Sequence, residues 1–203
     1  MLHPFEAIPA RWRRRILIPL TLAALLLSGW LAWANAALMN PAAPAGLWSL
    51  ALARDGYGAR EIIDAWEMLR PAPPRVDTAE GIVQQYPPSP VDAAIEVAQA
   101  RFWLIPLYAL ALSLACAWTG QAAGMRLAGL GYSLAAWLAA LLHAAENTAG
   151  LRVLLTRGPG GGEAALASAC FVARGALLAL ILAWLGRAGR RARGGKAGAE
   201  EAG

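Results

Sequence analysis

The chain has 203 residues, of which 58% are hydrophobic and 15% are charged, with a formal net charge of +5. Soluble domains carry about 25% charged residues, and the mean hydropathy here is +0.45. This composition excludes a disordered chain, a disulfide-rich secreted module and an ordinary cytosolic enzyme. The sequence therefore predicts an integral membrane protein.

Four apolar stretches are long enough to cross a bilayer, since a spanning helix needs roughly 20 mostly apolar residues. We expect helices because lipid offers backbone groups no hydrogen-bond partner, and because the stretches lack the alternation of barrel strands. The predicted fold class is an all-α integral membrane four-helix bundle, with short helices in the outer segment between spans 1 and 2. The predicted spans are residues 16–39, 101–119, 127–147 and 165–185.

The first span also resembles a secretory signal peptide. Arg11 and Arg13–Arg15 form a basic start, and Ala34-Asn35-Ala36 resembles a small-residue cleavage site. The apolar stretch from Ile16 to Trp33 is nevertheless longer than the usual signal-peptide core of about 7–15 residues. We therefore expect an uncleaved anchor.

Basic residues at both ends of the chain predict its orientation, because positive charge collects on the cytoplasmic side of membrane proteins. The residues assigned to the outer side carry more acidic than basic side chains. Both termini are therefore expected in the cytoplasm of a bacterial inner-membrane protein. The predicted cytoplasmic segments are residues 1–15, 120–126 and 186–203, and the predicted outer segments are residues 40–100 and 148–164.

Residues 40–100 are polar enough to leave the bilayer but have helical apolar spacing. Two short amphipathic helices are predicted on either side of a turn at Gly56-Tyr57-Gly58. Trp48 and Trp66 are typical of the membrane–water boundary. We interpret the segment as a packed cap in preference to a substrate lid. The apolar positions are Leu47, Trp48, Leu50, Leu52, Ile62, Ile63, Trp66 and Leu69.

Two helix starts are expected later in this segment. Asp77 with Glu80 resembles a capping box. Ser89 with Asp92 is a clearer one, because Pro90 between them suits the first helical position. The second of these helices is expected to continue into span 2.

Polar side chains within the spans are expected to face the bundle interior, because desolvating them next to lipid is costly. His143, Glu146 and Asn147 share one face of the third span. Small residues on the same stripe, at Gly131 and Gly150, predict close contact with a neighbouring helix. Because both termini are expected in the cytoplasm, the third span ends on the outer side, and these polar residues are expected in the outer half of the bilayer. Glu146 and Arg174 form a candidate ion pair. The predicted cluster, structural or ligand-binding, is Asn35, Arg101, Tyr108, His143, Glu146, Asn147 and Arg174.

No metal site, cofactor or disulfide is expected. The two histidines, His3 and His143, fall on opposite sides of the predicted membrane, which excludes a bis-histidine haem within one protomer and leaves too few ligands for zinc. Cys116 and Cys170 should lie about 20 Å apart given the helical rise, which is too far for a disulfide. The basic pI is explained by arginines next to the membrane, so nucleic acid is not an expected partner.

Residues 47–155 resemble a group of uncharacterised bacterial four-span membrane proteins. The resemblance rests on an outer amphipathic helix at Ala59–Leu69, on the aromatic start of span 2 at Phe102-Trp103-Leu104-Ile105-Pro106-Leu107-Tyr108, and on Leu141-Leu142-His143-Ala144-Ala145-Glu146-Asn147 at the end of span 3. An aspartate is common in that group where this chain has His143. The resemblance implies the topology and no established activity.

The function favoured by the sequence is that of an accessory or structural subunit, which packs against a larger membrane complex or itself. The first alternative is binding or transport of a lipid or small amphiphile through the polar cluster. The second is a membrane enzyme, with His143 and Glu146 as acid and base on a lipid-linked substrate; a non-enzymatic role is favoured. The expected partners are membrane lipids and other membrane subunits.

Overall fold

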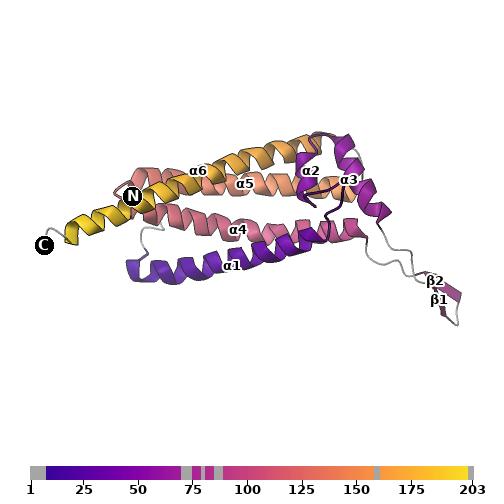
Figure 1. Ribbon diagram of the computed structural model, residues 1–203, viewed down its shortest axis with the longest axis horizontal. Helices are drawn as coiled ribbons and strands as arrows, with labels where there is room; N and C mark the ends of the chain where they lie inside the picture. Colours follow the sequence, from indigo (N-terminus) through magenta and orange to yellow (C-terminus); the bar gives the residue numbers. More distant parts are fainter. Residues whose placement is uncertain (1–7, 70–74, 79–80, 85–88, 158–160, 201–203) are drawn as a thin grey trace. The chain divides into compact units, whose positions relative to one another are not determined.

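The computed structural model describes residues 8–69, 75–78, 81–84, 89–157 and 161–200 (Figure 1). These residues are predominantly helical, and the predicted all-α fold class is confirmed. The elements, in chain order, are α1 (Ala10–Ala36), α2 (Trp48–Leu52), α3 (Gly56–Met68), β1 (Arg75–Thr78), β2 (Gly81–Gln84), α4 (Pro90–Ala122), α5 (Arg126–Thr156) and α6 (Gly161–Glu200).

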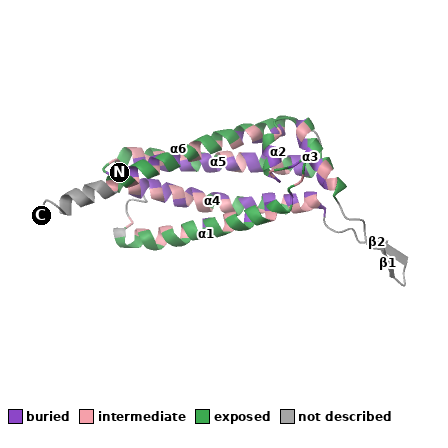
Figure 2. Ribbon diagram, viewed as in Figure 1, coloured by how far each residue is buried: buried purple, intermediate pink, exposed green. Residues whose placement is uncertain are grey.

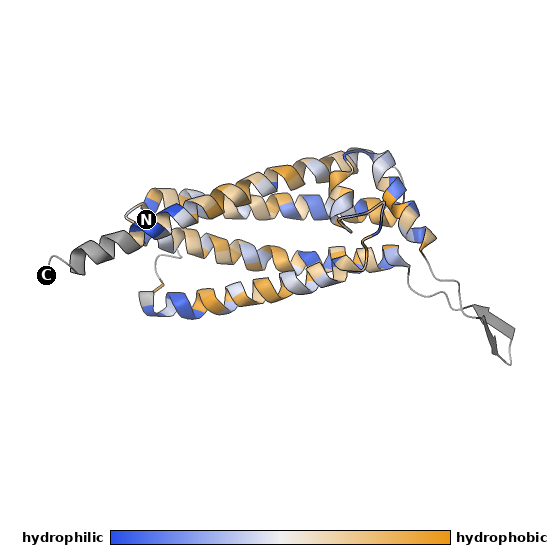
Figure 3. Cartoon of the chain, viewed as in Figure 1, coloured by the Kyte–Doolittle hydropathy of each residue, from blue (hydrophilic) through white to orange (hydrophobic). Residues whose placement is uncertain are grey.

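Four helices, α1, α4, α5 and α6, are long and apolar enough to cross a membrane, and the chain is a multi-pass membrane protein. Figure 3 shows the apolar residues distributed along these helices. The helices extend beyond the predicted spans: α1 begins at residue 10, α5 ends at residue 156 and α6 continues to residue 200. Hydropathy marks only the part within hydrocarbon, whereas arginine, alanine and leucine continue a helix in water.

The chain divides into two compact units. The bundle unit comprises residues 1–29, 103–144 and 170–203, and the cap unit comprises residues 30–102 and 145–169. Each of the four long helices contributes residues to both units. The seven polar residues predicted as one cluster divide between these two units.

Apolar side chains of α4, α5 and α6 form the core of the bundle unit. Cys116, Ala136 and Ile181 are fully buried in one cluster, where Tyr132 of α5 stacks on Trp184 of α6 with ring centroids 4.7 Å apart. A second cluster contains Ile105, Ala109 and Ala140. Alanine is frequent in both clusters, so the helices approach each other closely.

Gly120 and Gly129 form a close helix contact in the bundle unit, on either side of the turn from α4 to α5. A Cβ added to Gly129 would lie 2.9 Å from the Cys116 carbonyl oxygen and 2.9 Å from the Gly120 Cα. A Cβ on Gly131 would meet nothing within 4 Å. The close contact expected at Gly131 is therefore wrong, because this glycine is exposed.

Three polar side chains join α4 to α5 inside the bundle unit. The Ser113 and Ser133 hydroxyls are hydrogen-bonded at 2.6 Å, and the Trp137 indole N–H donates to the Ser113 oxygen at 3.2 Å. Both serines are buried. Hydrogen bonds satisfy these groups, which would otherwise be costly within the apolar bundle.

The amphipathic helices α2 and α3 begin the cap unit beyond α1. The predicted turn at Gly56-Tyr57-Gly58 is wrong, because these residues form the first turn of α3 and residues 53–55 separate the two helices. Asp55 begins α3, since its carboxylate accepts the Gly58 N–H at 2.8 Å. Aspartate is a favoured N-cap residue, and this cap moves the helix start toward the N-terminus.

Trp66 is fully buried and is the largest side chain at the centre of the cap unit. Its indole N–H donates to the Leu38 carbonyl oxygen at 2.8 Å, which fastens α3 to the segment after α1. Trp66 therefore packs inside the protein, and its expected position at a membrane–water boundary stays a prediction. Trp48 remains 46% exposed.

The segment between α3 and α4 contains an antiparallel pair of strands, β1 and β2, in which Val76 pairs with Val83. The expected helix start at Asp77 is therefore wrong, because Asp77 lies in β1; Glu80 lies outside the described residues. Valine and isoleucine favour strands. Two antiparallel strands thus replace part of the predicted helical cap.

The predicted start of α4 is confirmed. The Asp92 carboxylate accepts the Ser89 backbone N–H at 3.0 Å, and the Ser89 hydroxyl accepts the Asp92 N–H at 3.2 Å. Pro90 is the first residue of α4, and the helix continues without a break through the start of span 2. This reciprocal pair is a capping box.

Arg157 directly follows α5 and joins three elements of the cap unit. Its backbone has a φ of 48°, and its N–H donates to the Val153 carbonyl oxygen. Its guanidinium lies 3.1 Å from the Glu67 carboxylate of α3 and 3.8 Å from the Asp92 carboxylate of α4. These half-exposed ion pairs connect the C-terminal end of α5 to α3 and to the capped end of α4.

The long helices differ in how much of their apolar surface is covered. In the most apolar stretch of each helix, 44% of residues in α4 and 33% in α5 are buried, against 11% in α1 and 17% in α6. Figure 2 shows exposed residues along most of α1. We infer that α4 and α5 supply most of the protein contacts, while α1 and α6 present apolar side chains to their surroundings.

Candidate functional site

The seven predicted site residues divide into two groups. Asn35, Arg101, Glu146 and Asn147 belong to the cap unit, and the remaining three, Tyr108, His143 and Arg174, belong to the bundle unit. Asn35, Arg101, His143, Glu146 and Asn147 are each less than a tenth exposed. The ion pair between Glu146 and Arg174 stays a prediction, as does any acid–base pairing of His143 with Glu146.

Asn35 connects α1 to the loop that precedes α2. Its side-chain oxygen accepts the Leu47 N–H at 2.7 Å, and its side-chain nitrogen donates to the Ala45 carbonyl oxygen at 3.1 Å. The intervening Gly46 has a φ of +59° and lies against the same asparagine. The amide thus uses both of its ends to hold the backbone of one loop, which is a structural role.

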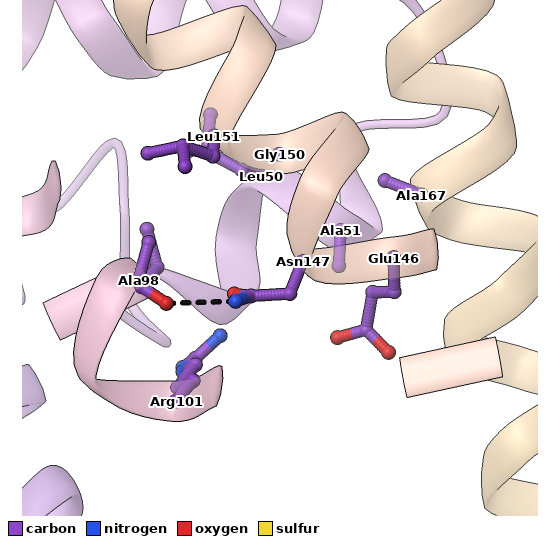
Figure 4. A pocket seen from close by; sticks show the side chains of 10 residues that line it. Leu50, Ala51, Ala98, Arg101, Glu146, Asn147, Gly150, Leu151 and Ala167 are labelled. Carbon is purple, nitrogen blue, oxygen red and sulfur yellow. Dashed lines mark hydrogen bonds between the residues drawn. The ribbon is translucent and has the colours of Figure 1, made fainter. Parts of the chain in front are cut away.

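Arg101, Glu146 and Asn147 line a cavity of about 20 Å³ in the cap unit. Figure 4 shows these side chains extending from α4 and α5 toward a shared space. The Asn147 amide donates to the Ala98 carbonyl oxygen at 2.7 Å. The Arg101 guanidinium carbon lies 5.9 Å from the centroid of the Trp48 ring, a cation–π distance.

This cap cavity is large enough for one water molecule, which needs about 10–15 Å³ of such volume. It is too small for a lipid, a cofactor or a substrate. We therefore interpret its charged and amide side chains as a packed polar network that connects α4 to α5 in the cap unit.

The bundle-unit residues surround a different and larger space. The Tyr108 hydroxyl donates to the Ala139 carbonyl oxygen at 3.3 Å, and the Tyr108 and His143 ring centroids are 5.7 Å apart. The Arg174 guanidinium carbon lies 5.3 Å from the centroid of the Phe171 ring. Tyr108, His143 and Arg174 all line one groove.

This groove, which we call the α1–α4–α6 groove, has a volume of about 540 Å³. Ligand pockets in proteins measure about 300–1,000 Å³. Its walls are mostly leucine and alanine. The lining residues are Leu17, Thr21, Ala24, Leu25 and Ser28 of α1; Leu104, Tyr108, Ala111, Leu112 and Ala115 of α4; His143 of α5; and Arg174, Leu178 and Leu182 of α6.

Helix direction determines which lining residues share an end of the groove. Arg13 near the start of α1 lies 5.7 Å from the Trp118 ring late in α4, so these helices are antiparallel. Cys116 of α4 and Ile181 of α6 share a core cluster, and Figure 1 shows α4 and α6 running in the same direction.

These directions give the groove one polar end and one apolar end. Ser28, Tyr108 and Arg174 are positioned at one end with His143, which neighbours Tyr108. Leu17 on α1 and Leu182 on α6 belong to the opposite end. Such a shape suits an elongated ligand that has a polar head and an apolar chain.

The part of the chain that the structure describes contains neither a cluster of metal ligands nor a disulfide. Within it, no group of three or more histidine, cysteine or acidic side chains could hold a metal ion. Cys116 and Cys170 are both buried, and neither forms a disulfide. His3 lies outside the described residues.

The extent of the groove was not predicted from the sequence. Tyr108, His143 and Arg174 were singled out because polar groups are rare inside spans, but the α1 contribution was missed. Thr21 and Ser28 are about two turns apart on α1 and were the available signal. Two hydroxyl residues at helical spacing in an apolar stretch indicate a face that meets other polar groups.

No protein-family model matches the chain, and no curated protein or solved structure matches it. The resemblance of residues 47–155 to bacterial four-span membrane proteins therefore stays a prediction. The geometry of the α1–α4–α6 groove is what remains to indicate a function for this multi-pass membrane protein.

Proposed function

We propose that this membrane protein binds the acyl chain of a lipid or small amphiphile in the α1–α4–α6 groove. The observation that carries the proposal is a groove of about 540 Å³ with leucine and alanine walls and with Tyr108, His143 and Arg174 at one end. A largely apolar pocket with a few convergent polar groups is the usual form of a small-molecule site.

The length of the groove supports an acyl chain as the occupant. On α1 its lining runs from Leu17 to Ser28, a rise of about 16 Å at 1.5 Å per residue. One leaflet of the hydrocarbon core is about 15 Å thick, half of the whole core. A chain of ordinary membrane length would thus cover the groove from end to end.

We further propose that the protein lies in a bacterial inner membrane with both termini in the cytoplasm. The support is the basic sequence around Arg11–Arg15 and Arg187–Arg193, which would flank spans 1 and 4 on that side. In this orientation the polar end of the groove would lie in the outer half of the bilayer. The ligand's head would then face the outer leaflet.

Filling the groove tests the proposal. Ala115 lines the apolar part and is half-buried, so Ala115→Phe should obstruct an acyl chain. We expect native mass spectrometry from nanodiscs to show one lipid retained by the wild-type chain and at least about tenfold less by Ala115→Phe, since losing a few buried methylenes costs 1.4 kcal/mol or more. Ala179→Phe, at an exposed position of α6 outside the lining, is the matched control.

Equal lipid retention by wild type, Ala115→Phe and Ala179→Phe would contradict the proposal. So would a wild-type chain that keeps no lipid at all. Because both variants add the same ring to a spanning helix, a general effect on extraction would change them equally.

An accessory role within a larger membrane complex, or in a self-assembly, is the second candidate. The observation that favours it is the large exposed apolar surface of α1, where Trp33 is 74% and Leu26 67% exposed. The same nanodisc measurement distinguishes it. A stoichiometric protein partner, without a retained lipid, would make this the better assignment.

A further inference from the structure

We propose that the α1–α4–α6 groove selects an anionic phospholipid, whose phosphate is held by Arg174 while one acyl chain lies along the groove. This inference rests on the proposed function, and it adds the chemical class of the ligand. The structure supports it through the charge of the lining, the depth of Arg174 and the position of the polar end.

The charge of the lining favours an anion. Among the described residues that line the groove, Arg174 is the one with a permanent charge, and none is acidic. The other polar lining residues are hydroxyl groups and His143. A head group that carries a negative charge is therefore matched, whereas the ammonium of a zwitterionic head finds no carboxylate in the lining.

The position of Arg174 along α6 also indicates a functional role. It is the only charged residue between Glu163 and Arg187, and the candidate span covers Gly161–Ala192. An arginine at this depth is costly, and such residues mark ligand or ion sites or pair inside the bundle. Arg174 lies at the polar end of the groove and not at a helix terminus, so its charge is placed where the head group of a bound ligand would lie.

The chemistry of arginine suits a phosphate. The guanidinium presents five donors in a planar fork that matches two phosphate oxygens. Five donors also allow Arg174 to bind an anion while it keeps its contact with the Phe171 ring and its other interactions. The phosphate would thus be held without dismantling the protein around Arg174.

The ligand's orientation follows from the two ends of the groove. With its phosphate at Arg174, the acyl chain would pass Leu178 of α6 and Leu112 of α4 toward Leu182 and Leu17. The groove holds one acyl chain in this arrangement, and the second chain of a two-chain lipid would remain in the surrounding bilayer.

The experiment uses the full chain in nanodiscs that contain equal amounts of phosphatidylglycerol and phosphatidylcholine with matched acyl chains. Native mass spectrometry counts the retained lipid and identifies it. We expect the wild type to retain phosphatidylglycerol at least about tenfold over phosphatidylcholine, since hydrogen bonds to charged groups contribute about 1.5–3 kcal/mol. Equal retention of the two lipids by the wild type would overturn the inference without any variant.

Variants then assign the preference to Arg174. Arg174→Gln should abolish the selectivity while lipid is still retained, and Arg174→Lys should keep most of it. Arg187→Gln removes the same charge from an exposed position of the same helix and should leave the selectivity unchanged. Equal losses in Arg174→Gln and Arg187→Gln would show a general attraction of basic residues for anionic lipid and would overturn the assignment.

Two measured quantities separate the two proposals. Total retained lipid reports whether the groove is occupied, which is the proposed function, and it falls in Ala115→Phe. The ratio of the two lipids reports the class of head group. A chain that retains lipid without selectivity keeps the proposed function and refutes this inference. If a free fatty acid is added to the same nanodiscs and is retained in place of phospholipid, that result also keeps the proposed function and refutes this inference.

Discussion

Gly46 in the cap unit combines a left-handed backbone conformation with a lack of space for a side chain. Its φ of +59° lies in the left-handed region, and a Cβ there would lie 2.7 Å from both the backbone and the side-chain oxygen of Asn35. The same asparagine holds Ala45 and Leu47 on either side. Backbone conformation and space thus both require glycine.

Gly46→Ala is predicted to destabilise the protein by roughly 2–4 kcal/mol, from about 1–2 kcal/mol of left-handed backbone strain plus the cost of overpacking. Gly124→Ala provides the matched control, because Gly124 has a φ of +69° but open space around it. The control should show the strain alone. Chemical unfolding of both variants in detergent measures the difference, and equal losses would show that Asn35 simply moves aside.

Helix pairing in the bundle unit depends on the turn between α4 and α5. The Met125 N–H donates to the Gly120 carbonyl oxygen at 2.7 Å, and Gly129 lies against Gly120 just beyond that turn. The two helices are thus held at their connected ends by backbone contact. Side-chain hydrogen bonds between Ser113 and Ser133 follow further along the pair.

Gly129→Ala should therefore destabilise the pairing of α4 with α5 by about 1–3 kcal/mol, the usual cost of overpacking. Gly131→Ala, two residues further along α5 and in open space, should leave stability unchanged or raise it, since alanine favours the helix by up to about 1 kcal/mol. Thermal unfolding of the two variants in the same detergent is the measurement. A larger loss in Gly131→Ala would contradict the structure.

Features that depend on neighbouring residues in the sequence were predicted better than features that depend on contact with a distant segment. Ser89, Pro90 and Asp92 act on one another over three residues, so the start of α4 was predicted correctly. The burial of Trp66 depends on Leu38, which is far away in the sequence. An amphipathic pattern alone does not predict which residue its tryptophan will contact. Gly129 was missed for the same reason, because a close approach needs the register of two helices.

The candidate site was predicted in part. Polar residues within spans are rare enough to be recognised singly, which is how Tyr108, His143 and Arg174 were found. Their spacing along one helix says which residues share a face, but it does not say which neighbouring helix completes a pocket. Thr21 and Ser28 of α1 therefore became visible as groove residues only in the structure.

For the whole molecule, the number of spans predicts that both termini lie on one side of the membrane. The four candidate spans among the described residues would return the chain to its starting side, and the basic ends predict that this side is the cytoplasm. Reporter fusions before Met1 and after Gly203 should both report a cytoplasmic location. A reporter inserted after Met68, which is 83% exposed at the end of α3, should report the opposite side. Termini on opposite sides would remove one of the four spans.

The hydrogen bonds of the cap unit also imply an order of assembly during synthesis. The Asn35–Leu47 bond closes over 12 residues, the Trp66–Leu38 bond over 28, and the Asn147–Ala98 bond over 49. Short loops close at the least entropic cost, and the chain emerges from its N-terminus. A nascent chain that stops before residue 147 can therefore form the first two contacts. The contact of α4 with Asn147 can form only after α5 has been synthesised.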